Sequence, residues 1–392
     1  MRLKNTTFII LCTSGLFAIF SSTISKSPVL PLFTVYLGAN PAVVGIIAAV
    51  SAFTGIVASI PAGILSDKIG RKKMLIFSAI VFSTAPFLYL FITQIWHLAI
   101  VRFYHGLATA IFVPVAMALV ADLFQQERGE KMGWFSTSTL GGRFVAPIVG
   151  GALIGAITFS PAMSFKAVYI VCGLAGIVTL ILILKLKTPA EKEPNKLPRS
   201  ELFGLFKMVI SNRFILITSA VEASILFAYG TFETFLPLYA IKVGLTAYEI
   251  GIFLSAQILV LALTKPIMGR FSDKHGRKPQ IFVGTIIGSI CIGSFFFFQS
   301  FIPLLFLSIV FGFCISIVTS ATAAFIADLS NIVSRGSAMG TLGSIMDIGH
   351  TTGPIVAGLV ALYFGLGYSF ISASIMLMFI AIVFGVSVML SR

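Results

Sequence analysis

Twelve long apolar runs dominate this sequence and limit what the chain can fold into. A helix needs about 20 predominantly apolar residues to cross a bilayer, and hydrophobic residues make up 58% of the chain against 10% charged ones. A water-soluble core needs no such composition. We therefore expect an all-α integral membrane protein with twelve transmembrane helices, near residues 8–34, 42–65, 74–93, 97–121, 132–156, 165–185, 213–239, 247–269, 279–297, 301–327, 337–361 and 366–390.

An internal repeat relates the first six runs to the last six. The stretch Gly63–Lys73 returns 206 positions later as Gly269–Lys278, and Ala121–Leu123 returns at the same offset as Ala327–Leu329. A repeat on this scale predicts two similar halves. We expect two pseudo-symmetric six-helix bundles, 1–185 and 213–392, joined by a cytoplasmic linker, 186–212, whose segment 200–211 has the apolar spacing of a surface helix.

The positions of the basic residues predict the orientation in the membrane. If both termini share one side, that side carries 21 of the 27 lysines and arginines, 2 lie on the other side and 4 lie within spans. By the positive-inside rule both termini are cytoplasmic in the cell membrane, or inner membrane. The net charge of +14 is then mainly a topology signal, and nucleic-acid binding is not expected.

The repeated stretch resembles motif A of the major facilitator superfamily in both of its copies. The resemblance extends to the twelve-span proton-coupled drug and metabolite antiporters, and it implies two six-helix bundles that rock about a central site. It also implies that Asp67 helps to close a cytoplasmic gate, with Asp273 as its counterpart. Gly63 and Gly70 are expected to permit close approach of the backbone. The predicted gating residues are Gly63, Asp67, Gly70, Arg71, Asp122, Asp273, Gly276, Arg277 and Asp328.

Two further segments resemble motifs of the drug exporters. Arg102 occupies the place of the buried arginine of motif B, although His105 replaces the usual glutamine there. His105 is either a titratable neighbour of Arg102 or a hydrogen-bonded structural histidine. The fifth run resembles motif C, whose glycines permit close helix packing. The predicted packing residues, with their echo in the second half, are Gly142, Pro147, Gly150, Gly349, Gly353 and Pro354.

Charged residues within spans are costly, so they indicate function. Glu222, Tyr229 and Glu233 share one face of the seventh run, and the repeat offset suggests that Lys26 and Glu233 approach each other. Lys265 either lines the cavity or extends to the cytoplasmic surface. The predicted proton-coupling residues are Glu233, Asp347, Glu222, Arg102, His105 and His350. The predicted substrate-binding residues are Lys26, Tyr229, Glu233, Arg143, Gln257 and Asp347.

Other classes of chemistry lack a pattern in the sequence. The four cysteines, Cys12, Cys172, Cys291 and Cys314, lie within predicted spans without ligand-like spacing, so we expect buried thiols and no metal site. A Gly-rich nucleotide-binding loop, which an ATP-driven pump needs, is missing from the sequence. We expect no enzymatic activity and no cofactor, and a monomer in the lipid bilayer whose partners are protons and a small-molecule substrate.

Three functions remain open at this stage. The first is a proton-coupled antiporter that exports small amphipathic drugs or metabolites by alternating access. The second is a symporter or facilitator for an anionic metabolite bound by Lys26, Arg102 and Arg143. The third is a lipid flippase or a non-transporting sensor on the same scaffold. Spacing alone gives neither the substrate nor the direction of transport.

Overall fold

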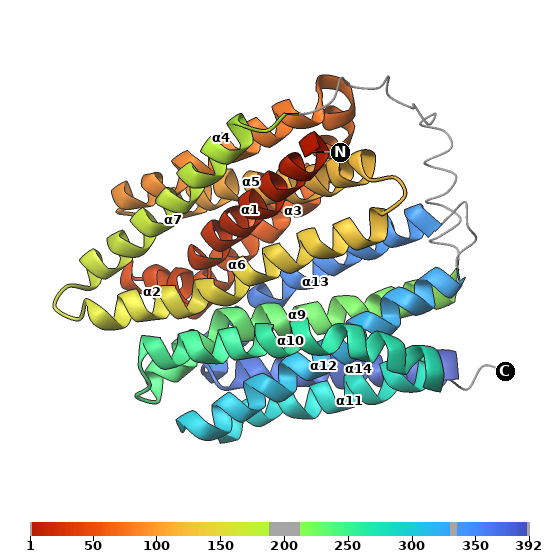
Figure 1. The fold of residues 1–392 in the computed structure, drawn as a ribbon. Helices are drawn as coiled ribbons and strands as arrows, with labels where there is room; N and C mark the ends of the chain where they lie inside the picture. The colour runs from red at the N-terminus through yellow and green to blue at the C-terminus, as the bar shows by residue number, and fades with distance from the viewer. Residues whose placement is uncertain (1, 188–211, 330–334, 390–392) are drawn as a thin grey trace. The chain divides into compact units, whose positions relative to one another are not determined.

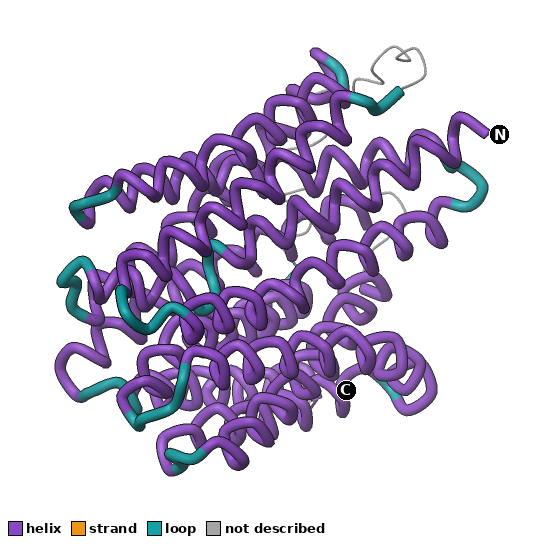
Figure 2. Tube along the Cα trace, turned by 60° about the vertical axis from the view of Figure 1, so that its left-hand side comes forward, coloured by secondary structure: helices purple, strands orange, loops and turns teal. Residues whose placement is uncertain are grey.

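The chain is helical throughout the part that the structure describes. The structure is a computed structural model, and it describes residues 2–187, 212–329 and 335–389. Over those residues no strand occurs and twelve helices are long and apolar enough to cross a membrane, which confirms the twelve predicted spans (Figure 2). The expected surface helix over 200–211, with most of the linker, lies outside the described residues.

The helices of the two halves follow one another in the same order, and the third, fourth and fifth helices of the first half have equivalents of identical length in the second half. The first half contains α1 (Arg2–Ile24), α2 (Val29–Tyr36), α3 (Pro41–Ile69), α4 (Arg71–Leu88), α5 (Ile95–Leu123), α6 (Arg128–Ala156) and α7 (Pro161–Leu184). The second half contains α9 (Arg213–Lys242), α10 (Ala247–His275), α11 (Arg277–Ser294), α12 (Phe301–Leu329), α13 (Arg335–Phe364) and α14 (Tyr368–Phe384). The bounds of α3, α4 and α5, shifted by 206, are those of α10, α11 and α12, so the sequence repeat is also a repeat of elements.

The contacts divide the described chain into two compact units. One unit takes the described parts of Met1–Ala39, Val50–Pro194 and Thr246–Ser255, and the other takes those of Asn40–Ala49, Asn195–Leu245 and Ala256–Arg392. The grouping differs from the predicted halves only at the linker and at the first turns of α3 and α10. The start of α3, up to Ala49, groups with the helices of the second half, and the start of α10, up to Ser255, groups with those of the first half.

Each unit repeats the same packing scheme. In the first, α1 packs on α6 and α7, and α4 packs on α5 and α7 (Figure 1). In the second, α9 packs on α13 and α14, and α11 packs on α12 and α14. The core of the first unit consists of apolar side chains from these helices, including Phe82, Phe112 and Phe135. Phe232, Phe295 and Phe311 are fully buried ring neighbours in the second.

Glycines of the predicted packing pattern permit close contacts between these helices. A Cβ at Gly142 would overlap the carbonyl oxygen of Leu16 on α1. At the equivalent place in the second unit, a Cβ at Gly349 would overlap the carbonyl oxygen of Ala223 on α9, and Gly353 meets the next turn of α9 in the same way. Gly150 differs, because its Cβ would lie 3.4 Å from its nearest neighbours, an ordinary van der Waals distance.

Glycines also explain why the first turns of α3 and α10 group as they do. A Cβ at Gly251 of α10 would lie 2.5 Å from the carbonyl oxygen of Pro147 on α6. A Cβ at Gly358 of α13 would lie 2.6 Å from the carbonyl oxygen of Pro41 at the start of α3. Such contacts are open only to residues without a side chain.

The first span is broken near Lys26. α1 ends at Ile24 and α2 begins at Val29, with Pro28 immediately before the second helix. Proline has no N–H group to continue the hydrogen bonds of a helix, and the turn is closed instead by the bonds from Lys26 N and Ser27 N to Thr23 O, at 3.0 and 2.9 Å. The sequence predicts one span over 8–34, and α1 and α2 together form one candidate span, Lys4–Tyr36.

Candidate functional site

A carboxylate and an imidazole meet in the second unit, between α9 and α13. His350 Nε2 lies 3.4 Å from Glu233 Oε2, and the Glu233 side chain is only 8% exposed. The ring of Tyr229, one turn earlier on α9, stacks on the imidazole with the centroids 5.6 Å apart. Both groups of the pair can hold a proton, so the pair can exist with two, one or no protons.

The remaining predicted residues of the second unit lie around this pair. Asp347 is half-buried one turn before His350 on α13, and its backbone oxygen accepts a hydrogen bond from the Thr351 hydroxyl at 2.7 Å. Gln257 of α10 is buried, and its Nε2 has no hydrogen-bond partner among the described residues. Lys265, also on α10, is exposed.

Glu222 occupies a separate buried place on the same helix. It is 2% exposed, and the hydroxyl of Thr322 on α12 lies within hydrogen-bond distance of its Oε2. The charge of Lys265 also acts on this carboxyl. Eleven residues separate Glu222 from Glu233, which is about 16 Å along a helix. The two carboxyls are therefore independent groups, although the sequence places both on one face.

Arg102 lies in the interior of the first unit. It is 3% exposed and donates to the hydroxyls of Ser51, on α3, and Tyr89, the latter at 3.5 Å. No carboxylate lies within ion-pair distance of its guanidinium in the described part of the chain, and its Nε has no partner there. A buried cation held by neutral hydroxyls is electrostatically costly.

Tyr89 connects Arg102 to His105. Its hydroxyl lies 3.5 Å from His105 Nδ1, and its ring stacks on that of Tyr169 from α7 with the centroids 4.2 Å apart. His105 is 3% exposed, and its Nε2 lacks a partner among the described residues. The predicted proximity of Arg102 and His105 is therefore present, with a tyrosine hydroxyl between them.

The other two basic residues within the spans of the first half, Lys26 and Arg143, are more accessible than Arg102. Lys26 lies half-buried in the break between α1 and α2. Arg143 lies on an exposed face of α6, next to Gly142. Non-helical backbone at membrane depth is tolerated where it is enclosed by protein or borders water. The break between α1 and α2 therefore indicates that Lys26 lies next to protein or water and not lipid.

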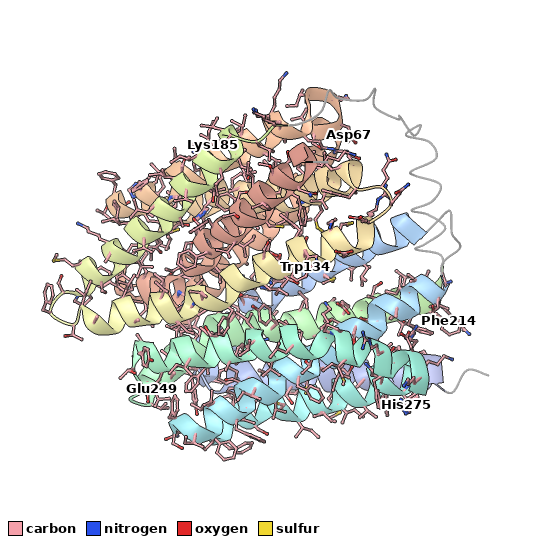
Figure 3. The ribbon with its side chains drawn as sticks, in the orientation of Figure 1. Asp67, Trp134, Lys185, Phe214, Glu249 and His275 are labelled. Carbon is pink, nitrogen blue, oxygen red and sulfur yellow. The ribbon has the colours of Figure 1, made fainter. Side chains whose placement is uncertain are left out.

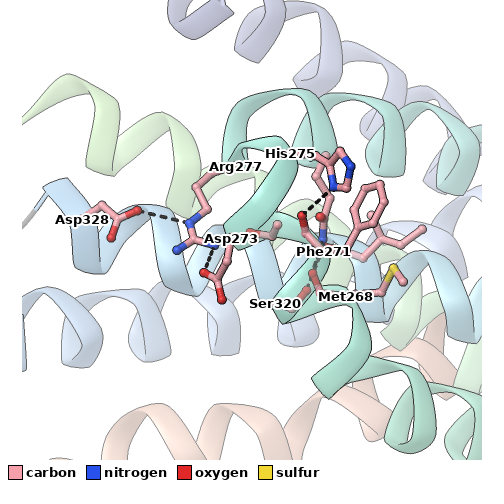
Figure 4. A network of polar contacts seen from close by, with 10 residues as sticks. Met268, Phe271, Asp273, His275, Arg277, Ser320 and Asp328 are labelled. Atoms are coloured by element: carbon pink, nitrogen blue, oxygen red, sulfur yellow. Dashed lines mark hydrogen bonds and ion pairs between the residues drawn. The ribbon is translucent and has the colours of Figure 1, made fainter.

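The two copies of the repeated stretch form the same ionic network at the ends of their helices. Arg71 binds Asp67 at 2.6 Å, Asp122 at 3.3 Å and the Ser66 hydroxyl at 2.6 Å. Arg277 binds Asp273, Asp328 at 3.2 Å and the Ser272 hydroxyl at 2.7 Å (Figure 4). In Figure 3 the label of His275 marks the end of α10 that lies next to the Arg277 network, and the label of Glu249 marks the opposite end of the same helix.

The glycines of these networks have different roles. Gly70 joins α3 to α4 with φ at 103°, and Gly276 joins α10 to α11 with φ at 91°. Positive φ values favour glycine, so both positions need that residue for a one-residue link between long helices. The expected close approach at Gly63 is wrong, because a Cβ there would meet no described atom within 4 Å.

Comparison with known proteins identifies the family. The model of the Major Facilitator Superfamily matches residues 11–262 and 240–392. The chain belongs to this superfamily. The transporter is 25% identical over 367 residues to the uncharacterized MFS-type transporter MJ1560 of Methanocaldococcus jannaschii, with 92% of each chain covered. It is 24% identical over 363 residues to Multidrug resistance protein 1 of Bacillus subtilis, with 92% of this chain and 91% of that protein covered.

A solved structure supports the fold. The bacterial homologue of the human lysosomal transporter Spinster, in its inward-facing and occupied conformation, matches with a TM-score of 0.84 at 16% identity, over 98% of this chain and 97% of that one. Together these findings show a non-enzymatic, multi-pass membrane transporter with the all-α twelve-helix fold that the sequence predicted.

Several residues of the transporter's polar clusters were missed by the sequence analysis. Tyr89, Tyr169 and Ser51 surround Arg102, and Thr322 contacts Glu222. Each is a common residue in an apolar run, and none belongs to a recognised motif. The unpaired charge of Arg102 was the available signal, because a buried guanidinium requires polar neighbours.

Proposed function

We propose that this transporter is a proton-coupled antiporter that exports small amphipathic drugs or metabolites by alternating access. The observation that carries the proposal is the buried Glu233–His350 pair, at 3.4 Å. A cationic substrate and a proton compete for the same carboxylate, because the occupation of Glu233 by one charge weakens its attraction for the other. Such competition couples the export of the substrate to the entry of a proton.

Further residues have assigned roles in this proposal. Asp347 is the second proton carrier, Glu222 is the third candidate, and Arg102 with His105 modulates protonation from the first unit. Tyr229 and Gln257, with Lys26 and Arg143, contact the substrate. The networks around Arg71 and Arg277 act as gates. The name of the Bacillus subtilis relative, Multidrug resistance protein 1, supports a drug-like substrate.

The proposed setting is the cell membrane, with a monomeric protein and both termini cytoplasmic. The support is the excess of lysine and arginine on one side of the predicted spans. A cysteine introduced near either terminus should then be labelled by a membrane-impermeant maleimide only after the cells are permeabilised.

The direct test uses weakly buffered proteoliposomes that hold the purified transporter. Addition of a lipophilic cation such as ethidium should acidify the external medium, because protons leave as the cation enters. The double variant Glu233→Gln with Asp347→Asn should abolish this pH change. The matched control is Glu249→Gln, which removes a half-buried carboxylate at the start of α10 that accepts hydrogen bonds from Thr246. Coupled transport that survives the double change would contradict the assignment.

One observation favours a second candidate, a symporter or facilitator for an anionic metabolite. Arg102 is a buried cation without a carboxylate among its described neighbours, and a substrate carboxylate or phosphate would supply the missing charge. In the same proteoliposomes an organic anion such as benzoate would then alkalinise the medium, because anion and proton enter together. Competition by organic anions and none by ethidium would establish this alternative.

A further inference from the structure

Several buried polar atoms on α9, α10 and α12 lack hydrogen-bond partners in the described part of the chain. Ser219 lies one turn before Glu222 on α9, and the Ser219 hydroxyl has no hydrogen-bond partner among the described residues. The same holds for Ser316 Oγ and Thr319 Oγ1 on α12, and for Gln257 Nε2 on α10. Buried polar groups in proteins are almost always paired with protein or with ordered water.

The hydroxyls of Ser316 and Thr319 differ from their equivalents elsewhere in the chain. Most helical serines and threonines here donate to a carbonyl of the preceding turn, as Ser308 does to Leu304 O at 2.8 Å and Thr285 does to Ile281 O at 2.7 Å. Ser316 and Thr319 do not make this local bond. Their hydroxyls are therefore available to another partner.

These hydroxyls form a ridge that ends at Glu222. Ser316, Thr319 and Thr322 are spaced by three residues along α12, so each is a neighbour of the next, with roughly 5–6 Å between Cβ atoms. Gln257 borders the Ser316 end, because Gly312, one turn before Ser316, packs against the backbone of Gln257. Oxygens at such separations are suited to bridging by one water molecule.

The contact between Thr322 and Glu222 suits both protonation states of the carboxyl. Thr322 Oγ1 lies within hydrogen-bond distance of Glu222 Oε2 and 2.9 Å from Val318 O. A hydroxyl has one proton and two acceptor sites. It can donate to a Glu222 carboxylate, or it can donate to Val318 O and accept from a protonated Glu222.

We propose that water molecules along the Ser316–Thr319–Thr322 ridge carry protons to and from Glu222, which makes Glu222 a proton-binding carboxyl in addition to Glu233 and Asp347. A proton enters at one water, passes from oxygen to oxygen, and neutralises the carboxylate. Each hydroxyl gives up one proton and gains another, so its composition is unchanged. The proposal rests on the proton coupling proposed above but concerns a site about 16 Å along α9 from Glu233.

The charged groups near this site are few. Lys265 of α10 acts electrostatically on Glu222. On α13, Asp347 lies two residues before Gly349, which packs against Ala223 beside Glu222. On α11 the buried Gln280 donates to Ile317 O and Ser320 Oγ of α12, at 3.1 and 3.4 Å. The buried side chains described on α12 and α14 include no acid and no base. The pH dependence measured for the Glu222 carboxyl should therefore also be measured in variants of Lys265 and Asp347.

Infrared difference spectroscopy of the purified transporter tests the proposal without transport. A step in pH should produce a carboxyl C=O band that Glu222→Gln removes, and transfer to D₂O should shift that band at a measurable rate. Thr319→Val keeps the shape of the side chain and removes the hydroxyl. It should slow hydrogen–deuterium exchange at the Glu222 carboxyl about tenfold, because the loss of one hydrogen bond raises the barrier to proton transfer.

Two further variants keep the test decisive. Thr231→Val removes another buried, unpartnered hydroxyl of α9, which lies about 180° around the helix from Glu222. It should leave the rate unchanged. Thr319→Ser restores a hydroxyl without the methyl group and should exchange at nearly the wild-type rate, even if Thr319→Val is poorly folded. Equal slowing by Thr231→Val, or unaltered exchange in a folded Thr319→Val, would overturn the proposal.

The failure of this proposal and the failure of the proposed antiport can be told apart, because the two tests measure different quantities. Glu233→Gln should weaken coupled transport and leave the Glu222 band and its exchange rate unchanged. If ethidium transport shows no proton coupling while Thr319→Val slows exchange, the antiport proposal fails and the water path stands. If ethidium transport is coupled to protons and Thr319→Val leaves the exchange rate unchanged, the water path fails and the antiport proposal stands.

Discussion

The two halves of the transporter are alike at their helix ends and unlike in their interiors. Arg71 and Arg277 each bind two aspartates and a serine hydroxyl at equivalent positions. In the interior, Ser308 stands at the position of Arg102, and Leu16 and Ser27 stand at those of Glu222 and Glu233, by the 206-residue offset. The difference indicates that duplication kept the structural framework while the polar chemistry diverged.

The two units bury charged side chains of opposite sign. The first unit buries a guanidinium, and the second buries two carboxyls. Buried charge is expensive in either unit, so its persistence at non-equivalent positions is best explained by a function that needs both signs. Three groups of variants test how far this comparison extends.

The largest effect is expected from Arg102→Met, compared with Ser308→Ala at the equivalent position. Loss of the guanidinium should reduce transport about tenfold or more, a barrier change of about 1.4 kcal/mol. The thermal unfolding midpoint should stay level or rise, because a buried charge without a carboxylate neighbour is removed. Ser308→Ala removes only a hydroxyl that bonds to Leu304 O.

Ser308→Ala should therefore change neither transport nor the midpoint appreciably. A purely structural role for Arg102 would give the opposite pattern, with a lower midpoint and retained transport per folded molecule. Proteoliposome transport and thermal unfolding in detergent distinguish the two.

Of the two expected effects on stability, the larger comes from Gly142→Ala and Gly349→Ala. The new methyl group would meet the carbonyl oxygen of Leu16 or Ala223 and force the helices apart. The cost should be roughly 1–3 kcal/mol of unfolding free energy in each half, typical of overpacking. Gly63→Ala is the matched control, because its methyl group meets no described atom within 4 Å.

Gly63→Ala should be neutral or slightly stabilising, since alanine is favoured over glycine in a helix by about 1 kcal/mol. Equal losses at Gly142 and Gly349 would extend the likeness of the halves to their helix packing. A large loss at one position alone would restrict that likeness to the ionic networks.

The smallest effect is expected from Arg71→Ala and Arg277→Ala. Both arginines are partly exposed, at 24% and 20% of the side chain, so each network should contribute about 1 kcal/mol or less to stability. Lys68→Ala, an exposed residue in the same stretch, is the control. Thermal midpoints in detergent that fall by similar amounts for the two arginines would confirm that the networks are equivalent in energy as well as geometry.

The sequence predicted the framework of this protein in detail. Run length and composition predicted twelve helices, because a bilayer leaves few ways to satisfy backbone hydrogen bonds. The repeat predicted the pairing of elements, and the observed bounds of α3 and α10 differ by the same 206 residues as their motifs. The resemblance to motif A led to Asp67 and Arg71, which bind each other.

The contacts of the polar residues followed from the sequence only in part. The helical spacing of Arg102 and His105 predicted their proximity, but Tyr89, which lies between them, comes after α4 and was not expected. Likewise, Glu222 was predicted to be functional because a carboxyl in an apolar run is rare. Its partner Thr322 lies 100 positions away, among many similar residues.

The sequence by itself determined which segments are helices, how the two halves correspond and which charges lie within spans. Only the tertiary structure decided that Glu233 meets His350 and that Glu222 meets Thr322. It also decided that a Cβ at Gly63 would meet no described atom within 4 Å, whereas one at Gly349 would overlap a neighbouring backbone. The physical reason is that helix formation depends on local hydrogen bonds and hydropathy, whereas these contacts depend on which helix packs beside which, and at what rotation.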